Sequence, residues 1–127
     1  MAKPTAHDGQ MVLQLATWYT ESQVGEAANW ARSDAFKADW AEFTKKFPTG
    51  SDGRMLLNRI LGYYETVGTL WKNRLIDEDL LFDWLWVPAT WDVVKNHALG
   101  MRTEFAISGL WGNFEAMAEH QRVAAAG

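Results

Sequence analysis

Residues 54–86 read RMLLNRILGYYETVGTLWKNRLIDEDLLFDWLW, and this stretch decides the fold of the chain. In its first half, apolar side chains recur at three- and four-residue steps, the spacing of one face of a helix. The stripe consists of Leu56, Ile60, Tyr63, Val67, Leu70 and Trp71. Gly62 and Gly68 each cost about 1 kcal/mol relative to alanine inside a helix. We therefore expect them to let a neighbouring helix approach closely.

The second half of the stretch begins with a helix cap. Asp77 is a residue type that caps helix N-termini, and Glu78 and Asp79 follow it at the positive end of the helix dipole. Proline is disfavoured inside a helix but accepted in its first turn, so Pro88 ends this helix and opens the next. The acidic cluster therefore has a structural explanation, which weakens a catalytic one.

Composition predicts one globular domain over residues 1–127. Apolar residues make up 48% and charged residues 22% of the chain, which is typical of a globular protein. Residues 1–7 and 123–127 are expected to be loose tails, and the turn-forming segment 48–53 to be a linker inside the domain. The eight tryptophans predict an indole-rich core, or a pocket or exposed patch that some of them line.

Apolar periodicity predicts further helices on both sides of the central stretch. The predicted segments are 8–18, 21–32, a stripe from Phe36 to Phe47, 88–105 and a final helix capped by Ser108. Thr20 to Gln23 has the form of a capping box, which would break the chain at 19–21. No segment alternates apolar and polar residues as a strand does. The predicted fold class is therefore all-α, a single-domain bundle of six or seven amphipathic helices with a Trp-rich core.

Charge and cysteine content exclude several classes of protein. The formal net charge is −4 and the basic residues are scattered, whereas a nucleic-acid surface needs a basic stripe. The absence of cysteine excludes disulfides and thiolate chemistry, and it fits a reducing cytoplasm. The chain shows neither a signal-peptide pattern nor an apolar run of about 18 residues. We therefore expect a soluble cytoplasmic protein with no membrane span and no nucleic-acid partner.

No residue pattern points to a metal, a cofactor or a catalytic centre. No Glu is followed three residues later by His, and H-E-x-x-H and G-x-S-x-G are absent. Glu65 lies on the long helix, and if it is buried, Arg102 is its expected partner. His97 is expected to be a partly buried, hydrogen-bonded histidine rather than a ligand.

The segment Trp84-Leu85-Trp86-Val87 follows the acidic cap. Helical residues two apart do not share a face, so Trp84 and Trp86 are not both expected to point into one core. One of them would then be an exposed anchor for a partner or a dimer contact, where Trp is enriched. The alternative is a helix covered on both sides that buries both indoles.

The central stretch resembles a known family. Residues 63–72, YYETVGTLWK, followed by residues 75–83, LIDEDLLFD, are similar to the central motif of a bacterial helical family catalogued as domain of unknown function 4760. Trp91, Arg102 and the segment from Trp111 to Glu115 match later landmarks of that family, a Trp, an Arg and an aromatic-x-x-Phe-Glu close.

This resemblance covers roughly residues 20–119 and implies a soluble helical domain. The family has no assigned activity that the resemblance could transfer. It supports Glu65, Asp77 and Arg102 as positions worth testing. The chain departs from the family pattern in its extra tryptophans.

Three functions remain open. We rank the enzymatic one last, because the sequence has no catalytic residue pattern. The first is a non-enzymatic interaction or oligomerisation module, a homodimer or a complex with another protein, that uses the aromatic surface around Trp84 and Trp86. The second is a small-molecule-binding protein with an aromatic pocket between helices. The third and least favoured is an enzyme built on Glu65, Arg102 and His97. The residues expected at an interaction surface or pocket are Tyr64, Glu65, Trp71, Asp77, Trp84, Trp86 and Arg102.

Overall fold

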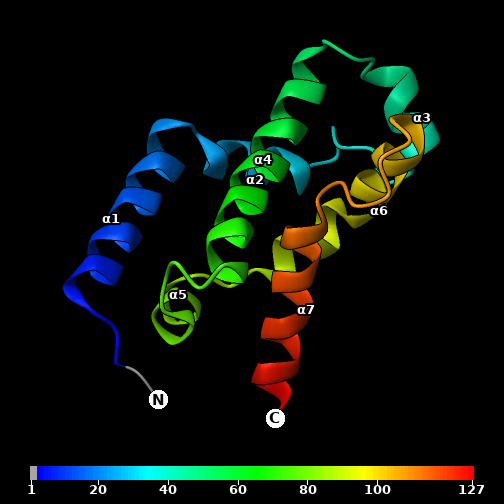
Figure 1. Ribbon diagram of the computed structural model, residues 1–127. Coiled ribbons are helices and arrows are strands. Elements are labelled where there is room, and N and C mark those ends of the chain that lie inside the picture. Colours follow the sequence, from blue (N-terminus) through cyan, green and yellow to red (C-terminus); the bar gives the residue numbers. More distant parts are fainter. Residues whose placement is uncertain (1–2) are drawn as a thin grey trace.

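The computed structural model describes residues 3–127, and helices account for most of them (Figure 1). The helices are α1 Ala6–Glu21, α2 Val24–Ala31, α3 Trp40–Lys46, α4 Asp52–Lys72, α5 Glu78–Trp84, α6 Pro88–Glu104 and α7 Gly112–Ala126. Within the described residues there are seven helices and no strand. The predicted all-α class is confirmed.

Helix α4 is the centre of the bundle. It packs most extensively against α7 and α2, and Figure 1 shows α7 beside α4 with α1 on its other side. Ile60, Tyr63 and Val67 of the predicted stripe are buried. The Tyr63 hydroxyl donates a 2.8 Å hydrogen bond to the carbonyl of Leu15 and so joins α4 to α1.

The two glycines of α4 have different surroundings. A Cβ on Gly68 would lie 2.7 Å from the carbonyl oxygen of Asn113, so this glycine allows the start of α7 to approach α4 closely. A Cβ on Gly62 would meet no atom within 4 Å. The close-approach prediction is confirmed for Gly68 and wrong for Gly62, whose presence no packing contact explains.

The break between the first two helices lies later than predicted. The Thr20 hydroxyl donates a 3.1 Å bond to the carbonyl of Ala16 inside α1, so the predicted capping box does not form. A threonine inside a helix satisfies its hydroxyl in this way without ending the helix. The capping box of the structure is formed by Thr5 and Asp8 at the start of α1. The chain leaves α1 only near Gln23, which has φ 58°.

The aromatic stripe from Phe36 to Phe47 is only partly helical. Asp39 accepts a hydrogen bond from the N–H of Glu42 and starts α3 there, which leaves Phe36 in the preceding turn. The rings still gather, since the centroids of Phe36 and Phe43 are 5.5 Å apart. The predicted helix was too long, whereas the predicted apolar cluster is present.

The ends of the chain are more helical than predicted. Trp111, with φ 63°, precedes α7 without a side-chain cap, so the predicted cap by Ser108 is wrong. Helix α7 continues to Ala126, through most of the predicted C-terminal tail. Helix α1 already starts at Ala6, and residues 1–2 of the predicted N-terminal tail lie outside the described residues.

Between residues 3 and 127, none of the helices combines the length and the apolar character that crossing a bilayer requires.

Candidate functional site

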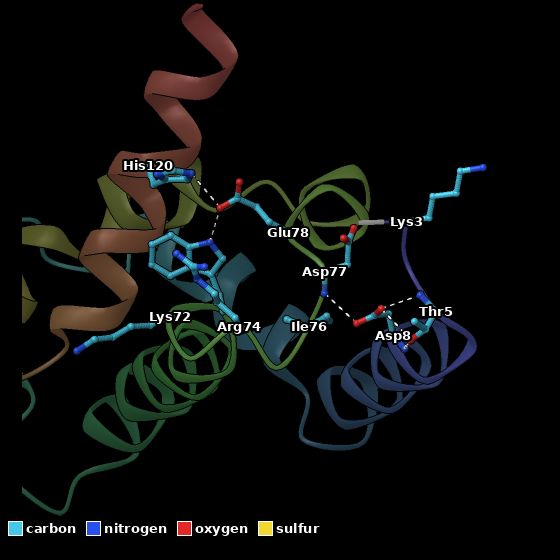
Figure 2. A pocket seen from close by; sticks show the side chains of 10 residues that line it. Lys3, Thr5, Asp8, Lys72, Arg74, Ile76, Asp77, Glu78 and His120 are labelled. Atoms are coloured by element: carbon cyan, nitrogen blue, oxygen red, sulfur yellow. Dashed lines mark hydrogen bonds and ion pairs between the residues drawn. The ribbon is translucent and has the colours of Figure 1, made fainter. Parts of the chain in front are cut away.

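An open pocket of about 690 Å³ lies where the start of α1, the end of α4, the start of α5 and helix α7 meet (Figure 2). Trp71 and Asp77, two of the predicted site residues, line it together with Ile76, which is buried. We call it the Trp71 pocket. Its walls come from four helices, so the tertiary fold creates it rather than any local motif.

Glu78 holds the indole wall of the Trp71 pocket in place. Its Oε1 accepts a 2.7 Å hydrogen bond from Nε1 of Trp71 and lies 2.9 Å from Nε2 of His120. The ring centroids of Trp71 and His120 are 5.4 Å apart, and Figure 2 shows Glu78 next to His120. Glu78 lies seven positions after Trp71 in the sequence. The turn between α4 and α5 brings its carboxylate next to the indole.

Asp8 and Asp77 form the opposite side of the pocket (Figure 2). Oδ1 of Asp8 accepts a 2.9 Å bond from the N–H of Asp77, and Oδ2 accepts a 2.7 Å bond from the N–H of Thr5. These bonds, that from the Thr5 backbone foremost, lower the pKa of Asp8. Asp77 accepts a bond from the N–H of Leu80 and caps α5, as the sequence predicts. Both oxygens of Asp8 and one oxygen of Asp77 therefore accept bonds from backbone donors.

Three basic side chains surround the pocket. Lys72 and Arg74 lie at the end of α4, and Lys3 lies across the pocket, near Asp77 (Figure 2). Arg74 has φ 58°, and its N–H donates a 3.1 Å bond to the carbonyl of Trp71 in the turn that ends α4. The four ion pairs found within residues 3–127 include none of the three basic residues.

A smaller pocket of about 270 Å³ lies between α1 and α5, and two more predicted site residues line it. Tyr64 and Trp84 line it together with Tyr19. Burial raises the pKa of Tyr64, so its hydroxyl stays protonated at neutral pH. This pocket has the aromatic walls that the sequence predicts for a binding site between helices, but it is much smaller than the Trp71 pocket.

The two neighbouring tryptophans are both partly exposed, Trp84 to 37% and Trp86 to 50%. Trp84 ends α5, and Trp86 follows in the segment that leads to α6. Gln121 of α7 holds this segment, because its Nε2 donates a 2.7 Å bond to the carbonyl of Leu85 and its Oε1 accepts a 2.8 Å bond from the N–H of Val87. Neither expected arrangement, one indole exposed or both buried, describes the pair.

Glu65 and Arg102 do not form the predicted pair. Oε1 of Glu65 accepts a 2.9 Å bond from the N–H of Phe114 at the start of α7. Arg102 instead donates to the carbonyl of Leu110 at 2.6 Å and to Glu115 at 2.9 Å. The prediction is wrong because α7 begins without its own side-chain cap and its backbone donors take the carboxylate of Glu65.

His97, the third residue of the enzymatic alternative, is fully buried among aromatic rings. Its ring centroid lies 4.4 Å from that of Phe36 and 4.7 Å from that of Phe43. Nε2 lies 2.7 Å from the carbonyl of Lys37, whereas Nδ1 has no hydrogen-bond partner. Burial lowers the pKa of His97. Glu65, Arg102 and His97 thus have separate partners, and none of them lines either pocket.

Asp8, Arg74 and His120 are pocket residues that the sequence does not predict. The predicted turn between Trp71 and Glu78 is a local signal that could have suggested the contact between these two residues. No such signal links Asp8 to Asp77, which lie 69 positions apart. Within the described residues, no cluster of three or more His, Asp and Glu side chains suits a metal ion.

Comparison with known proteins identifies the family of the chain. No curated protein and no solved structure matches it. The family model for the domain of unknown function DUF4760 matches residues 4–121. That match includes the central stretch, Trp91 and the segment from Trp111 to Glu115, on which the resemblance rested. The chain therefore belongs to the DUF4760 family.

Proposed function

We propose that this chain is a small-molecule-binding domain and that its ligand occupies the Trp71 pocket. One observation carries the proposal: the indole of Trp71, fixed by a 2.7 Å bond to Glu78, forms a wall of an open pocket of about 690 Å³. Small-molecule sites are typically concave, about 300–1,000 Å³ in volume, with aromatic walls and a few convergent polar groups.

The indole wall is also ordered in advance of binding. His120 and Phe82 pack against Trp71, with ring centroids 5.4 and 6.4 Å away. A side chain that is already held in position loses little conformational freedom when a ligand stacks on it. The Trp71 pocket therefore offers a large contact surface at a small entropic cost, which favours it over the smaller aromatic pocket as the principal site.

The indole N–H resonance of Trp71 gives a direct test. The Trp71→Phe variant identifies this resonance in a ¹⁵N spectrum of the labelled protein. We expect members of a panel of small aromatic acids, amides and amines to shift it and to raise the melting temperature, because a ligand that binds only the folded state stabilises it. Trp86→Ala changes an exposed indole outside the pocket, so it should respond to the same compounds. A panel that moves neither the Trp71 resonance nor the melting temperature would contradict the proposal.

Self-association through the tryptophan pair is the second candidate function, and the exposure of both indoles favours it. Tryptophan is enriched among the residues that dominate protein interfaces. Light-scattering mass after size exclusion tests it, with wild type and Trp86→Ala compared at equal concentration. A wild-type dimer that dissociates in the variant would support the interface. Two folded monomers would exclude self-association through this pair.

A further inference from the structure

We infer that the ligand of the Trp71 pocket is a small organic anion, one with a carboxylate or phosphate group, and that Arg74 anchors its charge. This inference rests on the proposed function and names the ligand class. Three features of the pocket support it: the state of its carboxylates, the state of its basic residues and the backbone of Arg74.

The carboxylates of the pocket already have hydrogen-bond donors from the protein. Asp8 accepts bonds from Thr5 and from the N–H of Asp77, and Asp77 accepts one from Leu80. Glu78 accepts from Trp71 and faces His120. Both oxygens of Asp8 and one oxygen each of Asp77 and Glu78 are used in this way. The acidic groups therefore shape the pocket and are poorly placed to recognise a positive charge.

The basic side chains of the pocket, unlike its carboxylates, have no hydrogen-bond partner within the described part of the protein. Within residues 3–127, the side chains of Lys3, Lys72 and Arg74 form no ion pair and donate no hydrogen bond. The guanidinium of Arg74 is therefore available to an incoming molecule, whereas Figure 2 shows the side chains of Lys3 and Lys72 extending outward from the pocket. The planar guanidinium of Arg74 matches the two oxygens of a carboxylate or the oxygens of a phosphate. The pocket thus presents an arginine with unused donors beside carboxylates that already accept bonds from the protein, which favours an anion.

The backbone of Arg74 points to the same residue. It has φ 58° directly after α4, in the position where a helix end favours glycine. An arginine there weakens the turn relative to glycine but supplies a cation to the pocket that Trp71 also lines. Arg74 can hold the charged group of a ligand whose flat part lies on Trp71.

A series of phenyl compounds with different charges tests the ligand class. The probes are benzoate, phenyl phosphate, neutral benzamide and cationic benzylamine, each titrated against the indole resonance of Trp71. We expect the two anions to bind at least about ten-fold more tightly than the other two, as expected for a hydrogen bond between charged groups. Their affinity should fall as salt is raised, because salt screens exposed charges. The two anions also reveal whether the pocket prefers a carboxylate or a phosphate.

Arg74→Gly tests the anchor without unfolding the protein. Glycine adopts the left-handed conformation freely, so this variant should melt at a higher temperature than wild type while binding the anions at least about ten-fold more weakly. Gln23→Gly is the matched control, because Gln23 also has φ 58° and lies outside the pocket. It should gain stability and keep full affinity. Arg74→Lys, which retains the charge, should keep most of the binding.

The outcomes separate the inference from the proposed function. If benzamide or benzylamine binds as tightly as benzoate, the anion inference is overturned and the small-molecule function stands. If the anions bind Arg74→Gly as tightly as wild type, Arg74 is not the anchor. If none of the four probes moves the Trp71 resonance, the inference fails, and the wider panel decides the proposed function separately.

Discussion

The carboxylate of Glu65 accepts a 2.9 Å hydrogen bond from the backbone N–H of Phe114, so a side chain of α4 caps α7. Helix α7 has no side-chain cap of its own. A negative charge at this end satisfies a free N–H and interacts favourably with the helix dipole. The carboxylate that looked like a catalytic candidate therefore fixes the position of the last helix.

We expect Glu65→Ala to lower the free energy of unfolding by about 1–2 kcal/mol, the usual effect of losing an N-terminal cap. Urea denaturation measures it. Glu65→Gln should lose less, because its amide oxygen can still accept the bond. Thr66→Ala, at the exposed neighbouring position, serves as control and should change stability by less than about 0.5 kcal/mol. Equal losses in Glu65→Ala and the control would contradict the capping role.

The two glycines of α4 should respond to alanine in opposite ways. At Gly62 a Cβ meets no atom within 4 Å, so Gly62→Ala should stabilise the protein by about 0.5–1 kcal/mol through helix propensity. At Gly68 the Cβ would lie 2.7 Å from a backbone oxygen of Asn113, which has to move. Gly68→Ala should therefore lower stability by about 1–3 kcal/mol, the usual effect of overpacking. Thermal melts of both variants check this, and a stabilised Gly68→Ala would show that α7 yields easily.

His97 should make the folded protein sensitive to acid. Burial, aided by Arg54 and opposed by the bond to Lys37 and by Asp39, lowers its pKa. The unfolded chain, with a histidine pKa of about 6.5, then takes up the proton more readily than the folded protein. The contribution of neutral His97 is therefore complete above about pH 6.5 and is lost as the pH falls from there to the folded pKa.

Urea midpoints measured from pH 8 to pH 5 test this sensitivity. His97→Phe, which removes the titrating group from the aromatic cluster, should lose less stability over that range than wild type. If His97→Phe and wild type lose equal stability between pH 7 and pH 5, other groups cause the acid sensitivity.

Gln121 should be among the more sensitive polar positions, because its buried amide bonds to both Leu85 and Val87. Gln121→Ala leaves these two backbone groups without partners, so we expect a loss of about 2–3 kcal/mol in unfolding free energy. Arg122→Ala, which breaks an exposed ion pair with Asp92, should cost less than about 1 kcal/mol. Chemical denaturation of the two variants side by side measures the difference between losing buried hydrogen bonds and losing an exposed ion pair.

The parts of the fold that the sequence predicts correctly depend on neighbouring residues. Asp77 caps α5 through the N–H of Leu80, three positions away, and Pro88 starts α6 in its first turn. Thr20 shows how such a local signal fails. In a capping box its hydroxyl oxygen would accept a bond from a backbone N–H, whereas in the continuing helix the hydroxyl donates to the carbonyl of Ala16.

The candidate site was predictable only in fragments, because its contacts join distant segments. Trp71 and Asp77 were predicted from the central stretch, but the partner of Asp77 is Asp8, from the first helix. Glu65 was matched with Arg102 by charge, whereas the structure pairs it with a backbone N–H. Backbone donors at a helix start have no distinctive residue type, so a sequence does not show where a distant carboxylate will find one.

The Trp71 pocket joins the first and the last helix, since Thr5 and Asp8 belong to the start of α1 and His120 to the middle of α7. A bound molecule would act as a non-covalent link between them. It would slow the fraying of both terminal helices, and protease cleavage at either end would become slower together. If the proposed ligand binds this pocket, its binding and the freedom of the two terminal helices would therefore be coupled.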